Sequence, residues 1–363
     1  MFDVLSMARE REKSGKYVAR MEIGDTPGFR NDYIHQLVTK YSASPYRYSP
    51  SRGEEVLINQ VIETQWQSAS ENNVVVGPAN FLITAALASK TSPGDIVLLP
   101  DPGFASYKLA ANFLDLRIIY YPVYEQGASI FPNLNDFVLG LKERPKAIIV
   151  NNPSNPLGVA FNSSVVRNSL ENFPGLGIEL IFDETYVNLV YDGTPTCVDD
   201  LPATRLRSFS KEHCAPGLRI GYAIADIAAA KTMGDLMSLT ISCVPQFIQF
   251  AVAEYLGSQQ SKDFTEKLRV EMARRLSVAA ASIPEGLMKT QPNAAFYSLI
   301  DAGEGGGDSA FKFLLERNVS TCPGSKFGEN AVNAIRVSLA GPSGAFDQDI
   351  QMLASALQEW QAK

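Results

Sequence analysis

A regular alternation of short apolar runs with helix-like segments is the feature that most constrains this fold. The apolar runs cover residues 74–76, 96–99, 117–123, 147–150, 179–182, 206–209 and 220–225. Strands without a polar face must be covered on both sides, and strands separated by helices usually align in parallel. The sequence therefore predicts an α/β fold, with a large domain built on a mostly parallel sheet covered by helices.

The pattern changes near residue 261, where a long charged helix is expected over residues 262–281. Two strand-like stretches follow, at residues 295–300 and 334–339. The chain has 363 residues, and one domain usually takes about 100–200 of them. We therefore expect two domains, a large one over residues 36–260 and a smaller α+β domain formed by residues 1–35 and 261–363.

The composition excludes several classes of function. The net charge of -7 offers no basic surface of the kind that nucleic acid binds. Four scattered cysteines and only two histidines match neither a disulfide framework nor a zinc site. No apolar run approaches the roughly 18–20 residues of a membrane span, and the charged N-terminal segment does not resemble a signal peptide. We expect a cytoplasmic protein that binds neither nucleic acid nor a membrane.

Polar residues with catalytic potential follow several of the expected strands. Asn155, Asp183 and Lys211 each come after an apolar run, and Tyr186 and Arg219 lie a few residues further on. In mostly parallel α/β sheets, ligands bind beyond the carboxyl ends of the strands. The five side chains offer an amide, a carboxylate, an amine, a phenol and a guanidinium, a set that suits an anionic, phosphorylated pyridine aldehyde. Each residue alone also has a structural interpretation, as a solvated lysine, a helix-capping carboxylate or a core tyrosine.

Taken in order, these motifs resemble those of the class I/II aminotransferase family, which are fold-type I enzymes of pyridoxal phosphate. The motifs are Asn155-Pro156-Leu157-Gly158, Asp183-Glu184-Thr185-Tyr186, Ser208-Phe209-Ser210-Lys211 and Gly217-Leu218-Arg219. The resemblance extends from about Phe2 to Leu339, nearly the whole chain. It implies an aminotransferase-like fold with a seven-stranded sheet, and pyridoxal 5'-phosphate as the cofactor.

The resemblance assigns a role to each residue around the cofactor ring. Lys211 is similar to the lysine that holds the cofactor covalently and later moves protons as a free amine. Asp183 matches the carboxylate that keeps the pyridine nitrogen protonated, so that the ring can withdraw electrons. Tyr186 and Asn155 match the groups that hydrogen-bond the phenolic oxygen of the cofactor. Asn155 is also implied to lie next to the substrate.

The phosphate group of the cofactor is expected at Ser208, Arg219 and the backbone amides of Ala79 and Asn80. Arginine can donate two parallel hydrogen bonds to a phosphate, and a helix N-terminus beyond Gly77 would offer free amides. The chain departs from the family here, because Pro78 and Ala79 replace residues that usually give an amide and a hydroxyl. Proline has no N–H, so this part of the phosphate site loses donors.

Four further residues match the family at the edges of the site. Phe104 resembles the aromatic residue that stacks on the pyridine ring, although a buried phenylalanine beside a turn is the alternative. Tyr48 resembles the tyrosine that reaches the phosphate of the partner subunit, which implies a homodimer with a shared active site; a surface turn is the alternative. Arg336 resembles the arginine that binds the substrate α-carboxylate, or else faces outward from an edge strand. Gly24 is implied to lie close to the substrate.

The resemblance implies an aminotransferase that moves an amino group from an L-amino acid to a 2-oxo acid by a ping-pong mechanism. A specialised pyridoxal phosphate enzyme, such as a decarboxylase, lyase, cyclase or oxidase, is the main alternative. A non-catalytic effector-binding module is a remote one. The segment from Glu212 to Pro216 is unusual for the family, and its His213 is either a second acid or base or a loop residue without a role. The substrate side chain and the amino acceptor stay open.

Overall fold

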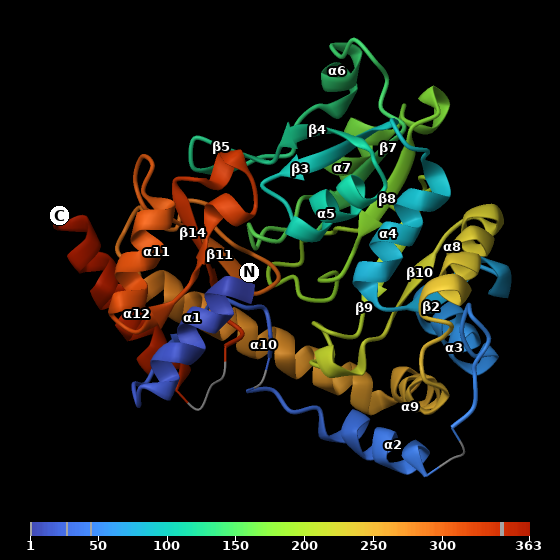
Figure 1. Ribbon diagram of the computed structural model, residues 1–363, viewed down its shortest axis with the longest axis horizontal. Coiled ribbons are helices and arrows are strands. Elements are labelled where there is room, and N and C mark those ends of the chain that lie inside the picture. The colour runs from blue at the N-terminus through green and yellow to red at the C-terminus, as the bar shows by residue number, and fades with distance from the viewer. Residues whose placement is uncertain (1, 27, 44–45, 342–344) are drawn as a thin grey trace.

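A seven-stranded sheet forms the centre of the molecule (Figure 1). The computed structural model describes residues 2–26, 28–43, 46–341 and 345–363. In spatial order the strands are β2 (Val74–Gly77), β10 (Gly221–Ile224), β9 (Thr204–Ser208), β8 (Glu179–Asp183), β7 (Ala147–Asn151), β3 (Ile96–Asp101) and β4 (Arg117–Pro122). All neighbours are parallel except β10, which runs antiparallel to β2 and β9. The predicted α/β fold with a mostly parallel sheet is confirmed.

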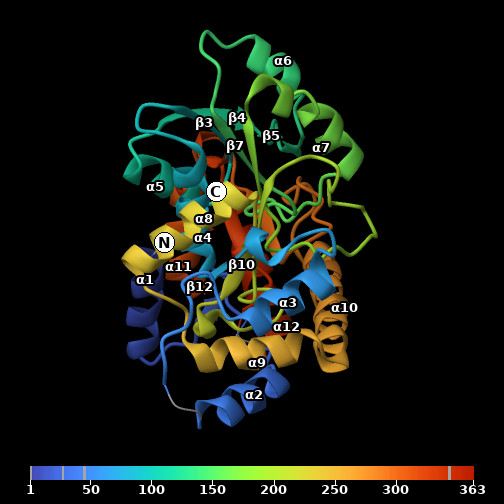
Figure 2. The ribbon, with the colours of Figure 1, turned by 90° about the vertical axis from the view of Figure 1, so that its right-hand side faces the viewer.

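Apolar side chains on both faces of each central strand explain why the sheet is buried between helices. Along β2, for example, Val75 faces one cluster of buried side chains while Val74 and Val76 face another. The first face is covered by α4 (Ala79–Lys90), α5 (Ala105–Phe113) and α8 (Ile227–Thr240). The opposite face is covered by α2 (Asp32–Ser42), α3 (Glu55–Gln65), α6 (Leu134–Leu139), α7 (Ser163–Leu170) and α9 (Gln246–Leu256). Figure 2 shows α2 lying along α9 at the outer edge of this layer.

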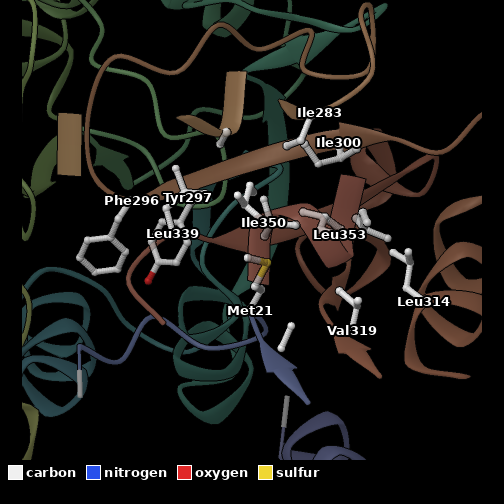
Figure 3. Close-up of a cluster of buried hydrophobic side chains, with 14 of the residues drawn as sticks. Met21, Ile283, Phe296, Tyr297, Ile300, Leu314, Val319, Leu339, Ile350 and Leu353 are labelled. Carbon is white, nitrogen blue, oxygen red and sulfur yellow. The ribbon is translucent and has the colours of Figure 1, made fainter. Parts of the chain in front are cut away.

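The C-terminal part of the chain forms a second sheet with its own core. This sheet is antiparallel and contains β11 (Tyr297–Asp301), β14 (Ala334–Ser338) and β13 (Cys322–Pro323). The surrounding helices are α1 (Phe2–Lys13), α10 (Gln259–Ser282), α11 (Gly307–Glu316) and α12 (Phe346–Gln361). Figure 3 shows the core that they share, with Met21 from the N-terminal segment packed beside Ile350 and Leu353 of α12.

The N-terminal segment is tied into this C-terminal unit by backbone pairing. β1 (Ala19–Arg20) pairs in parallel with β12 (Val319–Ser320), and the amide of Ser338 donates to the carbonyl of Met21 at 2.8 Å. The unit therefore has the α+β character that the sequence predicts, while the domain boundaries at residues 36 and 260 stay predictions. The remaining short elements are β5 (Tyr124–Glu125), β6 (Ala128–Ser129) and the 3₁₀ turns Glu71–Asn73, Pro174–Leu176, Pro216–Leu218, Gly324–Lys326 and Glu329–Ala331.

Helix α10 is longer than the sequence pattern predicts. It begins at Gln259 rather than near residue 262, because the Ser258 side chain accepts a hydrogen bond from the amide of Ser261 and so caps the first turn. In the described part of the chain, no helix combines the length and the apolar content that crossing a membrane requires.

Candidate active site

A cavity of about 210 Å³ lies where the carboxyl ends of the central strands meet the C-terminal unit. The cavity gathers nearly all the residues that the sequence singled out, namely Gly24, Ala79, Asn80, Phe104, Asn155, Asp183, Tyr186, Ser208, Lys211, Arg219 and Arg336. Larger clefts, of about 400, 650 and 710 Å³, lie elsewhere on the described surface and contain none of these side chains. The smaller cavity is therefore the candidate active site, at the place where ligands of such sheets bind, beyond the strand ends.

Lys211 reaches this cavity from the loop that follows β9. Its side chain is half-buried, and its Nζ donates a hydrogen bond to the carbonyl oxygen of Gly24 at 2.5 Å. The loop is compact, since the amide of Ser210 donates to Ser208 Oγ at 3.1 Å and the amide of Cys214 donates to the carbonyl of Lys211 at 3.3 Å. A neutral carbonyl holds the amine weakly compared with a carboxylate, so Lys211 is available to react with a carbonyl compound.

Asp183 is buried at the end of β8 and fixed by three hydrogen bonds. Its Oδ1 accepts from the hydroxyl of Thr185 at 2.6 Å and from the amide of Thr185 at 3.1 Å, and its Oδ2 accepts from the hydroxyl of Tyr107 at 2.6 Å. Burial raises the pKa of Asp183, and the hydrogen bonds from Thr185 and Tyr107 oppose that rise. A cation placed beside this carboxylate would lower its pKa and favour the ionised form.

Tyr186 and Tyr297 form a pair of buried phenols at the cavity wall. Their hydroxyl oxygens lie 3.0 Å apart, and their rings meet edge to face. Burial, followed by the neighbouring Tyr297, raises the pKa of Tyr186 well above its usual value. Tyr186 therefore stays protonated at neutral pH and can donate a hydrogen bond to an oxygen in the cavity.

Arg336 occupies the central strand of the C-terminal sheet and is only 1% exposed. Its Nη1 donates to Asn155 Oδ1 at 3.1 Å and its Nη2 donates to the carbonyl of Glu22 at 2.6 Å. The guanidinium is stacked between the rings of Tyr297 and Phe327, at 4.4 and 4.6 Å from their centroids. Among the described residues, Nε has no hydrogen-bond partner. A buried guanidinium that lines the cavity and keeps a free donor fits a carboxylate ligand.

The opposite end of the cavity is suited to an anion. Helix α4 begins at Ala79, and within the described residues no side chain caps its first turn. Ala79 and Asn80 line the cavity beside Ser208 and Arg219. Arg219 is exposed and donates from Nη1 to the carbonyl of Pro216 at 2.8 Å. The uncapped N-terminus of a 12-residue helix, together with a hydroxyl and a guanidinium, fits a phosphate group even without a donor from Pro78.

Gly24 leaves room for the phenol of Tyr297. A Cβ atom at position 24 would lie 1.7 Å from the Tyr297 hydroxyl oxygen and 2.7 Å from its Cζ. We expect Gly24→Ala to lower the free energy of unfolding by about 1–3 kcal/mol, as overpacked sites do, and to displace Tyr297 into the cavity. Chemical denaturation measures the first effect. Gly175→Ala is the matched control, because a Cβ there meets no described heavy atom within 4 Å; equal stability of the two variants would contradict the prediction.

Tyr48 is the one predicted residue that the structure does not bring into the cavity of its own chain. Its side chain is 89% exposed. The loop that carries it contacts the α8–α9 connection, where the amide of Ser49 donates to Cys243 Sγ at 3.4 Å, and the start of α9, where Tyr46 meets Phe247 edge to face. The role of Tyr48 at a partner subunit stays a prediction.

His213 lies outside the cavity, in a buried position between two aromatic rings. The ring centroids of Phe209 and Tyr255 are 5.1 and 5.3 Å from that of His213. Burial lowers the pKa of His213 to about 4, so the imidazole is neutral at physiological pH. The geometry favours a residue without a catalytic role over a second acid or base, and shows that its ring packs in the interior.

Two tyrosines that line the cavity, Tyr107 and Tyr297, were not identified as site residues from the sequence. Tyr107 follows Phe104 by three residues at the start of α5, a spacing that places both side chains on one side of a helical turn. That spacing was the available signal for Tyr107. Tyr297 carried no comparable signal, because it meets Tyr186 across 111 residues of sequence.

Comparison with known proteins identifies the family of this chain. The family model for aminotransferase class I and II matches residues 46–357. A (5-formylfuran-3-yl)methyl phosphate transaminase from Methanocaldococcus jannaschii is 27% identical, with 94% of this chain and 91% of that protein covered. A probable aspartate/prephenate aminotransferase from Aquifex aeolicus is 28% identical, with coverages of 98% and 95%.

Solved structures show the same fold along almost the whole chain. The aspartate aminotransferase of Thermus thermophilus with maleate superposes with a TM-score of 0.88 at 23% identity, covering 98% of this chain and 96% of that one. The aromatic aminotransferase of Pyrococcus horikoshii gives a TM-score of 0.88 at 22% identity, with coverages of 98% and 100%. Because the family model spans most of the sequence and the fold agrees throughout, the chain is a member of the class I and II aminotransferases, a family of pyridoxal phosphate enzymes.

Proposed function

We propose that this aminotransferase holds pyridoxal 5'-phosphate through Lys211 and exchanges an amino group between an L-amino acid and a 2-oxo acid. The observation that carries the proposal is the single cavity that combines the Lys211 amine, the Asp183 carboxylate and the Arg336 guanidinium. An amine, a buried carboxylate and a buried cation with a free donor have no common structural purpose at one cavity wall. Together they match what an aldehyde, a ring nitrogen and a substrate carboxylate require.

The residues around the cavity have different roles in binding the cofactor and in proton transfer. When bound, the protonated pyridine ring of the cofactor withdraws electrons from the bonds at the α-carbon of the amino acid. Asp183 would keep the ring nitrogen protonated, and Tyr186 and Asn155 would hold the phenolic oxygen. Lys211 would hold the aldehyde group of the cofactor and, as a free amine, would move a proton at Nζ as general acid and base. Phe104 would pack on the ring.

The substrate is held by its α-carboxylate. Arg336 lines the cavity, Asn155 Oδ1 and the Glu22 carbonyl fix the orientation of Nη1 and Nη2, and Nε has no hydrogen-bond partner among the described residues. Two donors in a planar fork give orientation as well as affinity. Relatives of this chain are named for aspartate, aromatic amino acids and a furan phosphate, so their names do not converge on one substrate side chain.

We infer that the active unit is a homodimer in which Tyr48 completes the phosphate site of the partner subunit. The exposure of Tyr48 supports this, since the phenol is accessible and does not line the cavity of its own chain. Leu239 and Ile241, at the end of α8 beside the Tyr48 loop, are also exposed apolar side chains. An exposed cluster of this kind is typical of a protein–protein interface.

Mixed dimers test the shared site directly. In a hybrid of one Lys211→Ala chain with one Tyr48→Ala chain, a shared arrangement rebuilds one intact site from the unchanged Lys211 of one chain and the unchanged Tyr48 of the other. We therefore expect the hybrid to recover about half of the wild-type turnover, although each parent homodimer is impaired. The measurement is steady-state turnover of tagged, purified hybrids. Hybrids no more active than the average of the two parents would contradict a shared site.

The state of the cysteines supports one cell compartment over another. All four cysteines are free, and unpaired thiols persist in a reducing environment. We infer a cytoplasmic location on this basis.

The first experiment is an absorbance spectrum of the protein mixed with pyridoxal 5'-phosphate, followed by a panel of amino acids without any oxo acid. We expect a visible band from the lysine-bound cofactor, which disappears with a reactive amino acid as an equal amount of 2-oxo acid forms. Release of carbon dioxide, ammonia or peroxide with a persistent band would instead indicate a decarboxylase, lyase, cyclase or oxidase. A protein that forms no band would contradict the role of Lys211 and favour a non-catalytic module.

A further inference from the structure

A buried carboxylate stands immediately beside Lys211 but does not line the active-site cavity. Glu212 is 4% exposed. Its Oε1 accepts a hydrogen bond from the backbone amide of Asn188 at 2.7 Å, and its Oε2 accepts one from Asn188 Nδ2 at 2.8 Å. None of the roles assigned to the cavity uses Glu212.

The two residues belong to the two loops that carry most of the chemistry. Asn188 follows Tyr186 by two residues in the turn after β8, and Glu212 follows Lys211 by one residue in the loop after β9. β8 and β9 are paired in parallel, and the amide of Glu184 donates to the carbonyl of Leu206 at 2.9 Å near the end of the strand pair. Beyond that point, the contact between Glu212 and Asn188 joins the tips of the two loops.

Keeping this carboxylate buried is energetically unfavourable, which indicates that its two acceptor oxygens have a use. Burial raises the pKa of Glu212 to about 7, while the backbone amide of Asn188, the charge of Arg207 and the side chain of Asn188 oppose that rise. Arg207 is itself bound to Glu184 Oε2 at 3.0 Å and to Gln65 Oε1 at 2.9 Å. If the side chain at position 212 only filled space in the loop, an apolar side chain would stabilise the fold more than a buried carboxylate does.

We propose that Glu212 is a positioning residue, whose two hydrogen bonds to Asn188 fix the Lys211 loop against the Tyr186 turn. The inference rests on the proposed function, because it concerns where the Lys211 amine lies relative to the Tyr186 hydroxyl. Misplacing a reacting group by about 1 Å can cost about 100-fold in rate. A contact that controls the relative position of both groups therefore acts on turnover without touching substrate.

We call the two hydrogen bonds between Glu212 and Asn188 the clamp. Three variants separate the effect of the clamp on turnover from its effect on the stability of the protein. Glu212→Ala removes both hydrogen bonds. Glu212→Gln keeps them, because its carbonyl accepts from the Asn188 amide and its NH₂ donates to Asn188 Oδ1 once that side-chain amide turns over. Asn188→Ala removes one hydrogen bond from an exposed side chain, so this variant is expected to fold even where Glu212→Ala does not. Glu285→Ala, on an exposed loop, is the control for losing a glutamate.

Loss of the clamp is expected to change the pH titration of the cofactor band and the kcat, which loss of a residue needed only for stability would not change. With pyridoxal 5'-phosphate bound, Glu212→Ala is expected to raise the midpoint of the pH titration of the visible band by about one unit, since a displaced Tyr186 no longer favours the deprotonated form. The kcat is expected to fall about 10- to 100-fold with little change in KM. Glu212→Gln should restore both quantities to near wild-type values, and Asn188→Ala should give an intermediate effect.

Two further measurements test whether Glu212 acts through its contact with Asn188. In the cofactor-free protein, amides of the turn over residues 184–189 should exchange hydrogen faster in Glu212→Ala than in Glu212→Gln. The double variant Glu212→Ala with Asn188→Ala should be no worse than Glu212→Ala alone, because the two residues act through one contact.

The outcomes distinguish the two levels of inference. A wild-type protein that forms no visible band overturns the proposed function and the positioning role with it. A normal wild-type band combined with an unchanged titration midpoint and kcat in Asn188→Ala and Glu212→Ala overturns the positioning role alone. So does a Glu212→Gln variant as impaired as Glu212→Ala, or additive losses in the double variant.

Discussion

Replacement of Lys211 by alanine is expected to remove the covalent cofactor adduct and to lower turnover by at least about 10⁴-fold. The loss is large because one amine has two tasks, attachment of the cofactor and movement of the α-proton. No other amine among the lining residues can take over either task, since the cations of the described cavity wall besides Lys211 are the two arginines, Arg219 and Arg336. Borohydride reduction followed by peptide mass spectrometry locates the adduct, and rapid mixing with amino acid measures the residual rate.

The matched control is Lys267→Ala, which removes an exposed lysine of α10. It should leave both the adduct and the rate unchanged. Phosphate binding should survive in Lys211→Ala, because the amides at the start of α4 and the Arg219 side chain are untouched. A reduced adduct found on a different lysine, or a Lys211→Ala protein with substantial turnover, would contradict the assignment of the reactive amine.

Replacement of Arg336 by lysine is expected to lower kcat/KM for amino acids by roughly 30- to 4,000-fold. The estimate follows from the loss of about 2–5 kcal/mol when one partner of a buried, hydrogen-bonded charge pair is removed. Lysine keeps the positive charge but not the planar fork, so it cannot satisfy Asn155 Oδ1, the Glu22 carbonyl and a substrate carboxylate at once. Steady-state kinetics with a reactive amino acid gives the ratio.

The cofactor band should be almost unaffected in this variant, which separates substrate binding from cofactor binding. Arg274→Lys serves as the control, because Arg274 lies partly exposed on α10 and pairs with Glu271 at 2.8 Å. Thermal unfolding of both proteins shows whether the buried site has been destabilised. An Arg336→Lys protein with wild-type kcat/KM would place the carboxylate-binding residue elsewhere.

The sheet could be predicted because each of its strands carries its own local signal. Runs such as residues 96–99 and 147–150 are apolar on both faces, and only a covered, mostly parallel sheet accommodates strands of this kind. The end of a helix is harder to predict. The start of α10 depends on one hydrogen bond, from the Ser261 amide to the Ser258 side chain, which hydrophobic periodicity does not report.

The candidate site was predictable to the extent that its residues follow strand ends in recognisable motifs. Asp183 and Lys211 are examples, since Asp183 ends β8 and Lys211 follows the end of β9 by three residues. The contacts that orient these groups depend on packing between distant segments. Tyr107 and Asp183 are 76 residues apart in the sequence, and Arg336 and Asn155 are 181 residues apart. The local sequence around these residues does not predict that they form hydrogen bonds with one another.

The segment from Glu212 to Pro216 also shows the difference between what local sequence predicts and what contacts between distant segments determine. The sequence marks this segment as unusual and directs attention to His213, the residue with the more familiar catalytic chemistry. In the folded chain the imidazole is packed between aromatic rings, whereas Glu212 holds the turn that follows Tyr186. A side chain's neighbours decide its role here, and those neighbours belong to another loop.

The pairing of β1 with β12 has a consequence for the synthesis of the protein on the ribosome. The Lys211 amine donates its hydrogen bond to the carbonyl of Gly24. The N-terminal segment that contains Gly24 is held in place by β12, which is translated near the end of the chain. At about 5–20 residues per second, the roughly 125 residues between Lys211 and Arg336 take about 6–25 seconds to emerge. During that interval a nascent chain already contains its reactive amine but has no group to hold a substrate. Premature termination before β14 therefore yields a protein that cannot turn over amino acids.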